Sequence, residues 1–289
     1  MSSQSDEFYP NLFASSGTPA LDVPGTDARW HTRAMNEDLP SIEILGIPIA
    51  CVDASEALME IDRLQHRQSP ALVAYVNAHS INLASRNPTY RDILERSDLN
   101  LNDGSGVSLA ARIQGRRFKE NLNGSDFNVA ILRLASRHEW PVFLLGAAEG
   151  VAEKAAQRLR ASIDGLNIVG THSGYWPASS TDQVVAAVRA SGADLVMVAM
   201  GNPRQEEWLA DHLDSTGARV GIGVGAFFDF TAGTVSRSPV WMNRFGIEWL
   251  WRLAQEPRRL WRRYVVGNPL FLARVLRSRV VARNRGSKG

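Results

Sequence analysis

Cysteine is almost missing from this chain of 289 residues, which contains Cys51 alone. One cysteine excludes an internal disulfide, a metal site built from several cysteines and a dithiol redox pair, and it suits a reducing cytoplasm. The chain also has no run of about 18 apolar residues, the length that a membrane-spanning helix needs. Its first residues include acidic ones and follow no positive-then-apolar pattern, so we expect no signal peptide.

Sequence motifs of several enzyme classes are missing as well. There is no Gly-x-x-x-x-Gly-Lys-Ser/Thr phosphate loop and no Gly-x-Ser-x-Gly nucleophile elbow, and the six histidines form no metal-ligand spacing. Asp-x-Asp, with which many sugar transferases hold Mg²⁺ or Mn²⁺ on a nucleotide diphosphate, is absent too. Residues 221–225, Gly-Ile-Gly-Val-Gly, lack the Gly-x-Gly-x-x-Gly spacing, and we predict no helix directly after them. We therefore expect neither a metal nor a bound cofactor.

The net charge of +2 conceals an uneven distribution of charge along the chain. Residues 252–289 contain ten arginines and one lysine against a single glutamate, a net charge of about +10, and the remaining 251 residues sum to about −8. A basic end on an acidic body indicates an anionic partner for that end, such as phosphates, nucleic acid or a lipid surface.

Apolar runs of strand length alternate with helical patterns through the middle of the chain. Such alternation produces βαβ units, so the predicted fold class is α/β: a Rossmann-like, mostly parallel sheet flanked by helices, with a basic amphipathic helical C-terminal appendage. We expect a disordered lead-in over residues 1–40, the α/β domain over 41–240 and the appendage over 241–289. The strands are predicted over residues 71–76, 98–102, 142–145, 166–169, 195–200 and 219–224, and the helices between them over residues 55–65, 107–113, 127–135, 150–161, 181–191 and 203–213.

The hexapeptide Gly-Asn-Pro-Arg-Gln-Glu at residues 201–206 joins a predicted strand to a predicted helix. Asn202 suits the N-cap of that helix, and Pro203 suits its first turn, where a missing N–H costs nothing. Ligands of open α/β sheets bind at such places, beyond the carboxyl end of a strand and against free helix N–H groups. The alternative is a well-formed βα turn that binds nothing.

Two polar residues follow other predicted strands. Asp103 stands in an Asn-Asp-Gly turn, where one carboxylate could take a proton from an acceptor hydroxyl if it faces a pocket. The alternative is a simple Asp-Gly turn. His79 also follows the end of a predicted strand. It could bind phosphate or act in acid–base chemistry, and the alternative is a packing residue at the start of a helix.

A helical wheel of residues 258–265 separates arginines from apolar residues. Arg258, Arg259, Arg262 and Arg263 fall on one arc, and Leu260, Trp261, Tyr264 and Val265 fall on the opposite one. This pattern is typical of a helix that lies on an anionic bilayer, and also of a solvated basic helix packed on its own domain. Nucleic acid fits less well, because the apolar arc needs an apolar partner.

With these residues laid out, the chain resembles the WecG/TagA/CpsF family of bacterial glycosyltransferases, glycosyltransferase family 26, from about residue 42 to 276. Each matching block is short, but their order along the chain is specific. The blocks are Asn77, Asp103-Gly104, Gly124-Ser125-Asp126, residues 143–146, Gly170 with Gly174-Tyr175, residues 201–206, residues 223–230, Ala232-Gly233, Arg237-Ser238-Pro239, residues 248–253 and Glu256-Pro257 with Arg259 and Arg262.

The resemblance implies an inverting, metal-independent transfer of a sugar from a UDP-sugar to a saccharide on a lipid diphosphate, undecaprenyl diphosphate in this pathway class. The enzyme would be peripheral on the inner face of the plasma membrane and serve exopolysaccharide, O-antigen-like or other envelope glycan synthesis. By the same resemblance, Asp103 is the general base, Asn77 lies near the sugar, and the diphosphate is held by Arg252, Arg259 and Arg262.

Two residues depart from the family pattern. Tyr75 replaces a threonine and Asn121 an arginine, so both could reshape the substrate site, and the donor stays open among N-acetylmannosamine, its uronic acid and glucose. Oligomeric state is open as well, a homo-oligomer included. The remaining expected substrate-binding residues, which surround Asp103 or shape the nucleotide pocket, are Gly104, Gly201, Asn202, Pro203, Gln205, Gly223 and Gly225.

Two other functions are compatible with parts of the sequence. A nucleotide-dependent oxidoreductase could use the same kind of sheet, although the dinucleotide fingerprint is missing. A non-catalytic basic adaptor could bind anionic lipid through the tail, and such a protein would not depend on Asp103.

Overall fold

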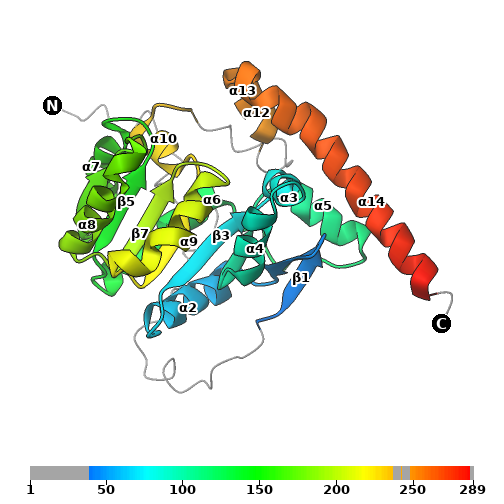
Figure 1. Cartoon of the computed structure of the whole chain (residues 1–289), viewed down its shortest axis with the longest axis horizontal. Coiled ribbons are helices and arrows are strands. Elements are labelled where there is room, and N and C mark those ends of the chain that lie inside the picture. The colour runs from blue at the N-terminus through cyan, green and yellow to red at the C-terminus, as the bar shows by residue number, and fades with distance from the viewer. Residues whose placement is uncertain (1–38, 237–241, 243–247, 287–289) are drawn as a thin grey trace.

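The computed structural model describes residues 39–236, 242 and 248–286 of the chain. Its centre is a parallel sheet of six strands (Figure 1). In order across the sheet these are β4 (Leu99–Asn102), β3 (Ala71–Val76), β8 (Val220–Gly223), β7 (Leu195–Ala199), β5 (Val142–Gly146) and β6 (Ile168–His172). The predicted fold class is therefore confirmed, and the strand order, which the sequence did not reveal, places β3 and β8 side by side.

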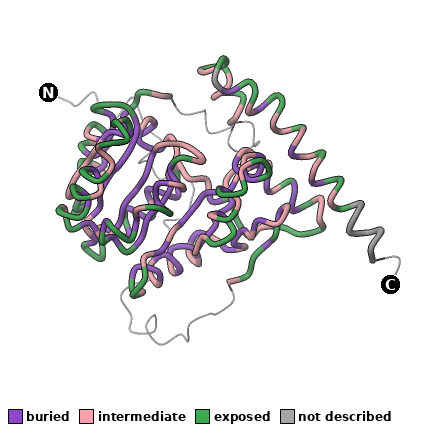
Figure 2. Tube along the Cα trace, in the orientation of Figure 1, coloured by how far each residue is buried: buried purple, intermediate pink, exposed green. Residues whose placement is uncertain are grey.

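Helices cover both faces of the sheet, and the strands between them are largely buried except for the half-buried edge strand β6 (Figure 2). Strands with two covered faces read as unbroken apolar runs, and β7 shows this, because all five of its residues are buried. One face packs against α2 (Ala54–Gln65), α6 (Gly124–Arg137), α7 (Val151–Ser162) and α10 (Phe227–Ala232). The other packs against α3 (Ala78–Ala84), α4 (Pro88–Arg96), α8 (Thr181–Ser191), preceded by the short η1 (Ala178–Ser180), and α9 (Arg204–Thr216).

An antiparallel hairpin of β1 (Ser41–Ile44) and β2 (Ile47–Ala50) extends this second face beyond β4. Its buried isoleucines join the cluster formed by α3, α4 and α5 (Ser105–Ile113). The same cluster contains two residues from the far end of the sequence, Phe271 and Val275, and neither is exposed to solvent.

The C-terminal segment is a series of helices that runs along the outside of α3 and α5 (Figure 1). Phe271 and Val275 anchor it, since burying two such side chains contributes about 3–6 kcal/mol. Pro257 opens a helix, as predicted. The elements are α12 (Glu248–Gln255), α13 (Pro257–Trp261), the π-helical turn η2 (Arg262–Val266) and α14 (Gly267–Gly286).

The predicted apolar arc of this segment is divided between two environments. Leu260 and Tyr264 are buried against the protein, whereas Trp261 and Val265 are 45% and 55% exposed. The helical wheel therefore predicted a helix correctly, but it could not show which part of the apolar arc the rest of the protein covers. Within the described ranges, no helix is both long enough and apolar enough to span a bilayer.

Three predictions concern residues that the structure does not describe. The disordered lead-in lies outside it except for Leu39 and Pro40, and so do the domain boundary at residues 240 and 241 and the Arg237-Ser238-Pro239 block. The division of the chain into residues 1–40, 41–240 and 241–289 stays a prediction.

Candidate active site

Asn77 and Asp103 meet at the carboxyl end of the sheet. They follow directly after β3 and β4, whose last residues, Val76 and Asn102, are paired in register. The Asp103 N–H donates to the Val76 carbonyl at 2.9 Å, which fixes the backbone of the loop. Asn77 Nδ2 donates to Asp103 Oδ2 at 3.1 Å. The parallel pairing of two adjacent strands thus places an amide beside a half-buried carboxylate.

The Asn77 side chain is itself held by the helix that it caps. Asn77 Oδ1 accepts from the N–H groups of His79 and Ser80, and the Asn77 N–H donates to Ser80 Oγ at 2.7 Å, completing a capping box at the start of α3. Because its oxygen is committed to the helix, the Asn77 amide nitrogen points at Asp103. The amide orientation seen here therefore follows from the cap.

Asn121 and Gly104 form the other side of the Asp103 loop. Asn121 Oδ1 accepts from the Gly104 N–H at 2.9 Å. Gly104 has φ +87°, a backbone conformation that suits glycine, and no described residue lies within 4 Å of the position that a Cβ would take. Among the described residues the space beside Gly104 is therefore open, and a substrate group could approach the Asp103 loop there.

Tyr75 lies beneath this loop, 6% exposed, with its ring against Gly124. Its hydroxyl donates to Asn128 Oδ1 at 2.9 Å. Burial raises the Tyr75 pKa well above its ordinary value, and the nearby Asp103 charge raises it further. Tyr75 is thus a buried, neutral residue beneath the Asp103 loop. Direct contact between Tyr75 and substrate stays a prediction.

Gln205 joins the two glycine turns at the carboxyl ends of β7 and β8. Its buried Oε1 accepts from the N–H of Gly201 at 3.1 Å and from the N–H of Gly225 at 3.0 Å. Gly223 gives Gln205 the room to do so, because a Cβ at residue 223 would lie 2.7 Å from Gln205 Nε2. Two separate turns are thus held together as one unit.

The predicted N-cap role of Asn202 is wrong. Pro203 occupies the cap of α9, no side chain caps this helix, and the Asn202–Pro203 peptide bond is cis. The Asn202 amide instead donates to Glu206 Oε1, four positions on, at 2.7 Å, and to Tyr90 Oη at 3.1 Å, a partner that only the tertiary fold brings near.

The prediction of no helix after residues 221–225 is also wrong, since α10 starts at Phe227. This helix is six residues long and buries five of them, so it has no polar face to give a periodic signal. Its first turn lies beside the Gly225 turn at the same edge of the sheet.

Two titratable groups near the site are neutral by burial. Burial raises the pKa of Glu206, which is fully buried, to about 8, although hydrogen bonds from Gln205 and Asn202 oppose the shift. Burial also lowers the pKa of His79 to about 4, and the charge of Arg263 adds to this effect. His79 is thus an uncharged packing residue at the start of α3, and Arg263 of the C-terminal segment lies close enough to influence it.

The arginines expected to hold a diphosphate lie on α12, α13 and η2. Arg252 stacks over the ring of Phe230 in α10, with 5.3 Å between Cζ and the ring centroid, and its buried Nε has no hydrogen-bond partner in the described part of the chain. Arg262 is exposed and lies over the Trp261 ring. The side chain of Arg259 lies outside the described residues. Arg252 therefore has the clearest connection to the sheet edge.

An exposed aromatic group completes this edge at the end of β6. Tyr175 is 73% exposed, and the guanidinium of Arg204, in the hexapeptide turn, lies 5.9 Å from its ring centroid and 5.7 Å from that of Trp176. Such a ring can stack on a planar ligand.

Since β3 lies between β4 and β8, the Asp103 loop and the turns joined by Gln205 share one edge of the sheet. The arrangement offers a carboxylate base, uncapped helix N–H groups at α9 and arginines for an anion. Over the described ranges, no group of three or more His, Cys, Asp or Glu side chains could hold a metal ion. Sequence reasoning missed Ser80, Tyr90 and Glu206, of which Glu206 alone had a signal, its place in the hexapeptide.

Comparisons with known proteins identify the family of this chain. A model described as the Glycosyl transferase WecG/TagA/CpsF family matches residues 42–285. A relative from Bacillus spizizenii (strain ATCC 23059 / NRRL B-14472 / W23), named N-acetylglucosaminyldiphosphoundecaprenol N-acetyl-beta-D-mannosaminyltransferase, is 32% identical over 194 residues, which cover 67% of this chain and 74% of the relative. The chain belongs to the WecG/TagA/CpsF family of glycosyltransferases.

Proposed function

We propose that this glycosyltransferase moves a sugar from a UDP-sugar to a saccharide linked to undecaprenyl diphosphate, with inversion and without a metal, in cell-envelope glycan synthesis. The observation that carries the proposal is the Asp103 carboxylate, held by Asn77 on the same sheet edge as the turns joined by Gln205. The name of the Bacillus relative favours N-acetylmannosamine over its uronic acid or glucose, and an N-acetylglucosamine diphospholipid as acceptor.

Asp103 acts as the general base in this proposal. Its carboxylate accepts the proton of the acceptor hydroxyl while that oxygen forms a bond to the anomeric carbon of the donor. The open space beside Gly104 is where the hydroxyl would enter. Asn77 keeps the carboxylate oriented, because its amide nitrogen donates to Asp103 Oδ2.

The leaving group is UDP, and its departure places negative charge on the β-phosphate as the glycosidic bond breaks. Arg252, Arg259 and Arg262 would neutralise that charge, since a guanidinium is always charged and grips phosphate with two N–H groups. The unpartnered Nε of Arg252 supports this role. The uncapped N-terminus of α9 and the turns at Gly201 and Gly225 would hold the nucleotide, and Tyr175 could stack on its base.

The C-terminal helices would also bring the site to its lipid-linked acceptor on the inner face of the plasma membrane. Trp261 and Val265 are exposed next to exposed arginines, a combination that suits an anionic bilayer surface. Replacing both with serine should weaken binding to anionic liposomes while leaving the melting temperature unchanged, because neither side chain packs in the interior. Equal binding of wild type and variant would contradict this membrane role.

The test is UDP release from a panel of UDP-sugars, with an undecaprenyl-diphosphate-linked N-acetylglucosamine in detergent, in the presence and absence of EDTA. We expect turnover with UDP-N-acetylmannosamine that EDTA does not reduce. Turnover that requires a divalent metal would contradict the proposed mechanism, and no UDP release from any donor in the panel would contradict the proposed reaction.

A further inference from the structure

A continuous series of hydrogen bonds connects the turn after β7, where the donor would bind, to the Asp103 loop through the protein interior. It is called the hydrogen-bond chain below. At one end, Asn202 Nδ2 donates to Glu206 Oε1 and to Tyr90 Oη. Tyr90 is the third residue of α4. Burial raises its pKa, and a hydrogen bond to the side chain of Ser80 in α3 opposes that shift. The chain thus starts on the turn after β7 and reaches α3 through a residue of α4.

At the other end, Ser80 connects directly to Asn77. Ser80 Oγ donates to the Asn77 carbonyl at 2.8 Å and accepts from the Asn77 N–H at 2.7 Å. Asn77 Nδ2 then donates to Asp103 Oδ2. Two of these steps are long-range, Asn202 to Tyr90 over 112 positions and Asn77 to Asp103 over 26, and the others are local.

The donors along this route are committed one after another. The Asn202 amide uses both of its hydrogens, on Glu206 and Tyr90, so the Tyr90 hydroxyl accepts there. The Ser80 hydroxyl directs its hydrogen to the Asn77 carbonyl, so towards Tyr90 it accepts. A change at one end therefore alters what the next group can do.

The middle of the chain is fully removed from water. Tyr90, Ser80 and Glu206 are each 0% exposed. A buried polar group that loses its partner cannot turn to solvent, so the neighbouring groups must rearrange or stay unsatisfied. Such networks hold their members more rigidly than surface contacts do.

We propose that Tyr90 and Glu206 are positioning residues for the transfer reaction: they hold Ser80 and Asn77, and through them Asp103, in a fixed relation to the nucleotide turns. The proposal rests on the function proposed above for Asp103. Neither residue touches substrate in it, and their effect is on the placement of the base relative to a donor bound at residues 201–206.

The experiment compares wild type with Tyr90→Phe, which removes only the hydroxyl. Since a misplacement of about 1 Å can cost about 100-fold in rate, we expect kcat to fall about 10- to 100-fold while the KM for the UDP-sugar stays within about twofold. Glu206→Met is the second variant if Tyr90→Phe folds poorly, because it removes the carboxyl oxygen that accepts from Asn202 and keeps nearly the same side-chain length.

Thr216→Val is the matched control. Thr216 is buried at the opposite end of α9 and donates to the Leu213 carbonyl at 2.6 Å. Its replacement by valine removes one buried hydroxyl that is not part of the hydrogen-bond chain. It should leave kcat and KM unchanged. If Tyr90→Phe and Glu206→Met behave as Thr216→Val does, the proposal is wrong.

Crystal structures of wild type and Tyr90→Phe give a readout that needs no turnover. The inference predicts that the 3.1 Å contact between Asn77 Nδ2 and Asp103 Oδ2 lengthens or is lost in the variant. An unchanged contact would overturn it. If wild type released no UDP, the proposed function would fail, and these structures would still decide the positioning role.

Discussion

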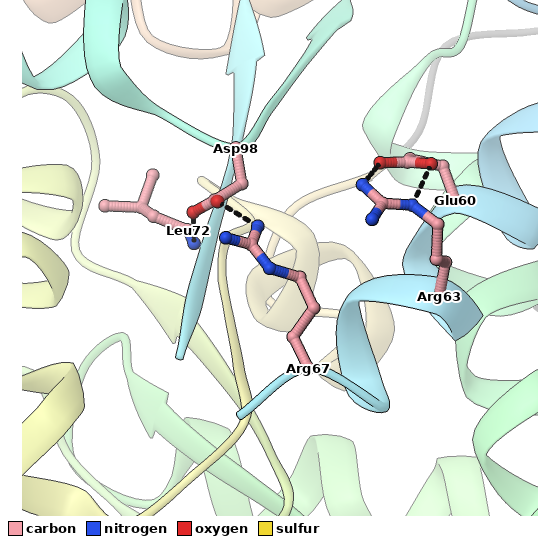
Figure 3. Close-up of polar contacts among 5 residues, drawn as sticks. All are labelled: Glu60, Arg63, Arg67, Leu72 and Asp98. Atoms are coloured by element: carbon pink, nitrogen blue, oxygen red, sulfur yellow. Dashed lines mark hydrogen bonds and ion pairs between the residues drawn. The ribbon is translucent and has the colours of Figure 1, made fainter. Parts of the chain in front are cut away.

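Two aspartates flank the four-residue strand β4, and their surroundings differ. Asp98 precedes the strand and is fully engaged: Arg67 Nη1 donates to it at 2.5 Å and the Leu72 N–H at 2.9 Å (Figure 3). Asp103 follows the strand and accepts from the neutral Asn77 amide, and the described residues place no ion pair on it.

The two aspartates therefore have different roles at the two edges of the sheet. At the amino edge, the Arg67–Asp98 pair holds β4 against the segment before β3, and Asp98 also accepts from a backbone N–H. This pair therefore contributes to stability. At the carboxyl edge, Asp103 has no cationic partner among the described residues, so it is available to a substrate. The same residue type, five positions apart, is therefore expected to matter for stability at one edge and for activity at the other.

A large effect that would sharpen this comparison involves one arginine from each edge. Arg252→Ala should lower kcat about 100-fold, because it removes a cation from the departing diphosphate, with little change in stability. Arg67→Ala is the matched control and should reduce stability while leaving kcat unchanged. Steady-state kinetics and thermal melting of both variants measure this, and a fall in kcat for Arg67→Ala alone would reverse the assignment of the edges.

Glu206 extends the comparison to a buried carboxyl. Its pKa is about 8 in the folded protein against 4.5 for a free glutamate, so between these values the folded state keeps a proton that the unfolded state has lost. Stability should therefore fall as pH rises from 4.5 to 8, by up to about 1.4 kcal/mol per pH unit.

Glu206→Gln removes the titrating group and should abolish that slope in denaturant unfolding across the same interval. Asp211→Asn, an exposed carboxylate of the same helix, is the control and should keep it. An identical slope in Glu206→Gln and wild type would show that Glu206 is not the group responsible.

His79 should have the opposite sign and a narrower range. Its pKa is about 4 in the folded protein against 6.5 when free, so the unfolded state binds more protons between these values. Stability is present above pH 6.5 and is lost as pH falls toward 4. His79→Gln should remove this loss, measured as the free energy of unfolding over that range. A variant that loses stability in acid as wild type does would contradict the burial of a neutral His79.

How much of this could be read from the sequence depends on whether the signal is local. The strands β3 and β7 were predicted to within a residue because each is an apolar run between breaks. The strand order was not, although it decides which loops meet. Asp103 and Asn77 were both named, but their contact depends on the pairing of β3 with β4, which no spacing within the chain reveals.

The errors have the same cause. Asn202 stands in a typical capping sequence, yet its side chain does not cap α9. Its amide nitrogen donates instead to Glu206 and to Tyr90, which is 112 positions away. The apolar arc at residues 260–265 was read correctly as a pattern, but its division into buried Leu260 and exposed Val265 depends on where the body lies. Sequence periodicity identifies faces, and tertiary packing decides what covers them.

The smallest expected effect concerns an exposed ion pair within α4. Arg96 Nε lies 2.8 Å from Asp92 Oδ1, and the two side chains are 79% and 54% exposed. Surface pairs of this kind contribute little, so Arg96→Ala should change the free energy of unfolding by no more than about 0.5 kcal/mol and leave activity unchanged. A loss as large as that of Arg67→Ala in the same urea titration would show that exposure does not distinguish the two pairs.

The most direct measurement compares Asp103→Asn with Asp98→Asn, assayed for UDP release and for unfolding free energy in parallel. Asp103→Asn should reduce kcat by about 10²- to 10⁴-fold with unchanged stability, since it removes the base and keeps the shape. Asp98→Asn should lose about 1 kcal/mol of stability and keep its kcat. Full activity in Asp103→Asn, or a comparable loss of activity in Asp98→Asn, would contradict the account.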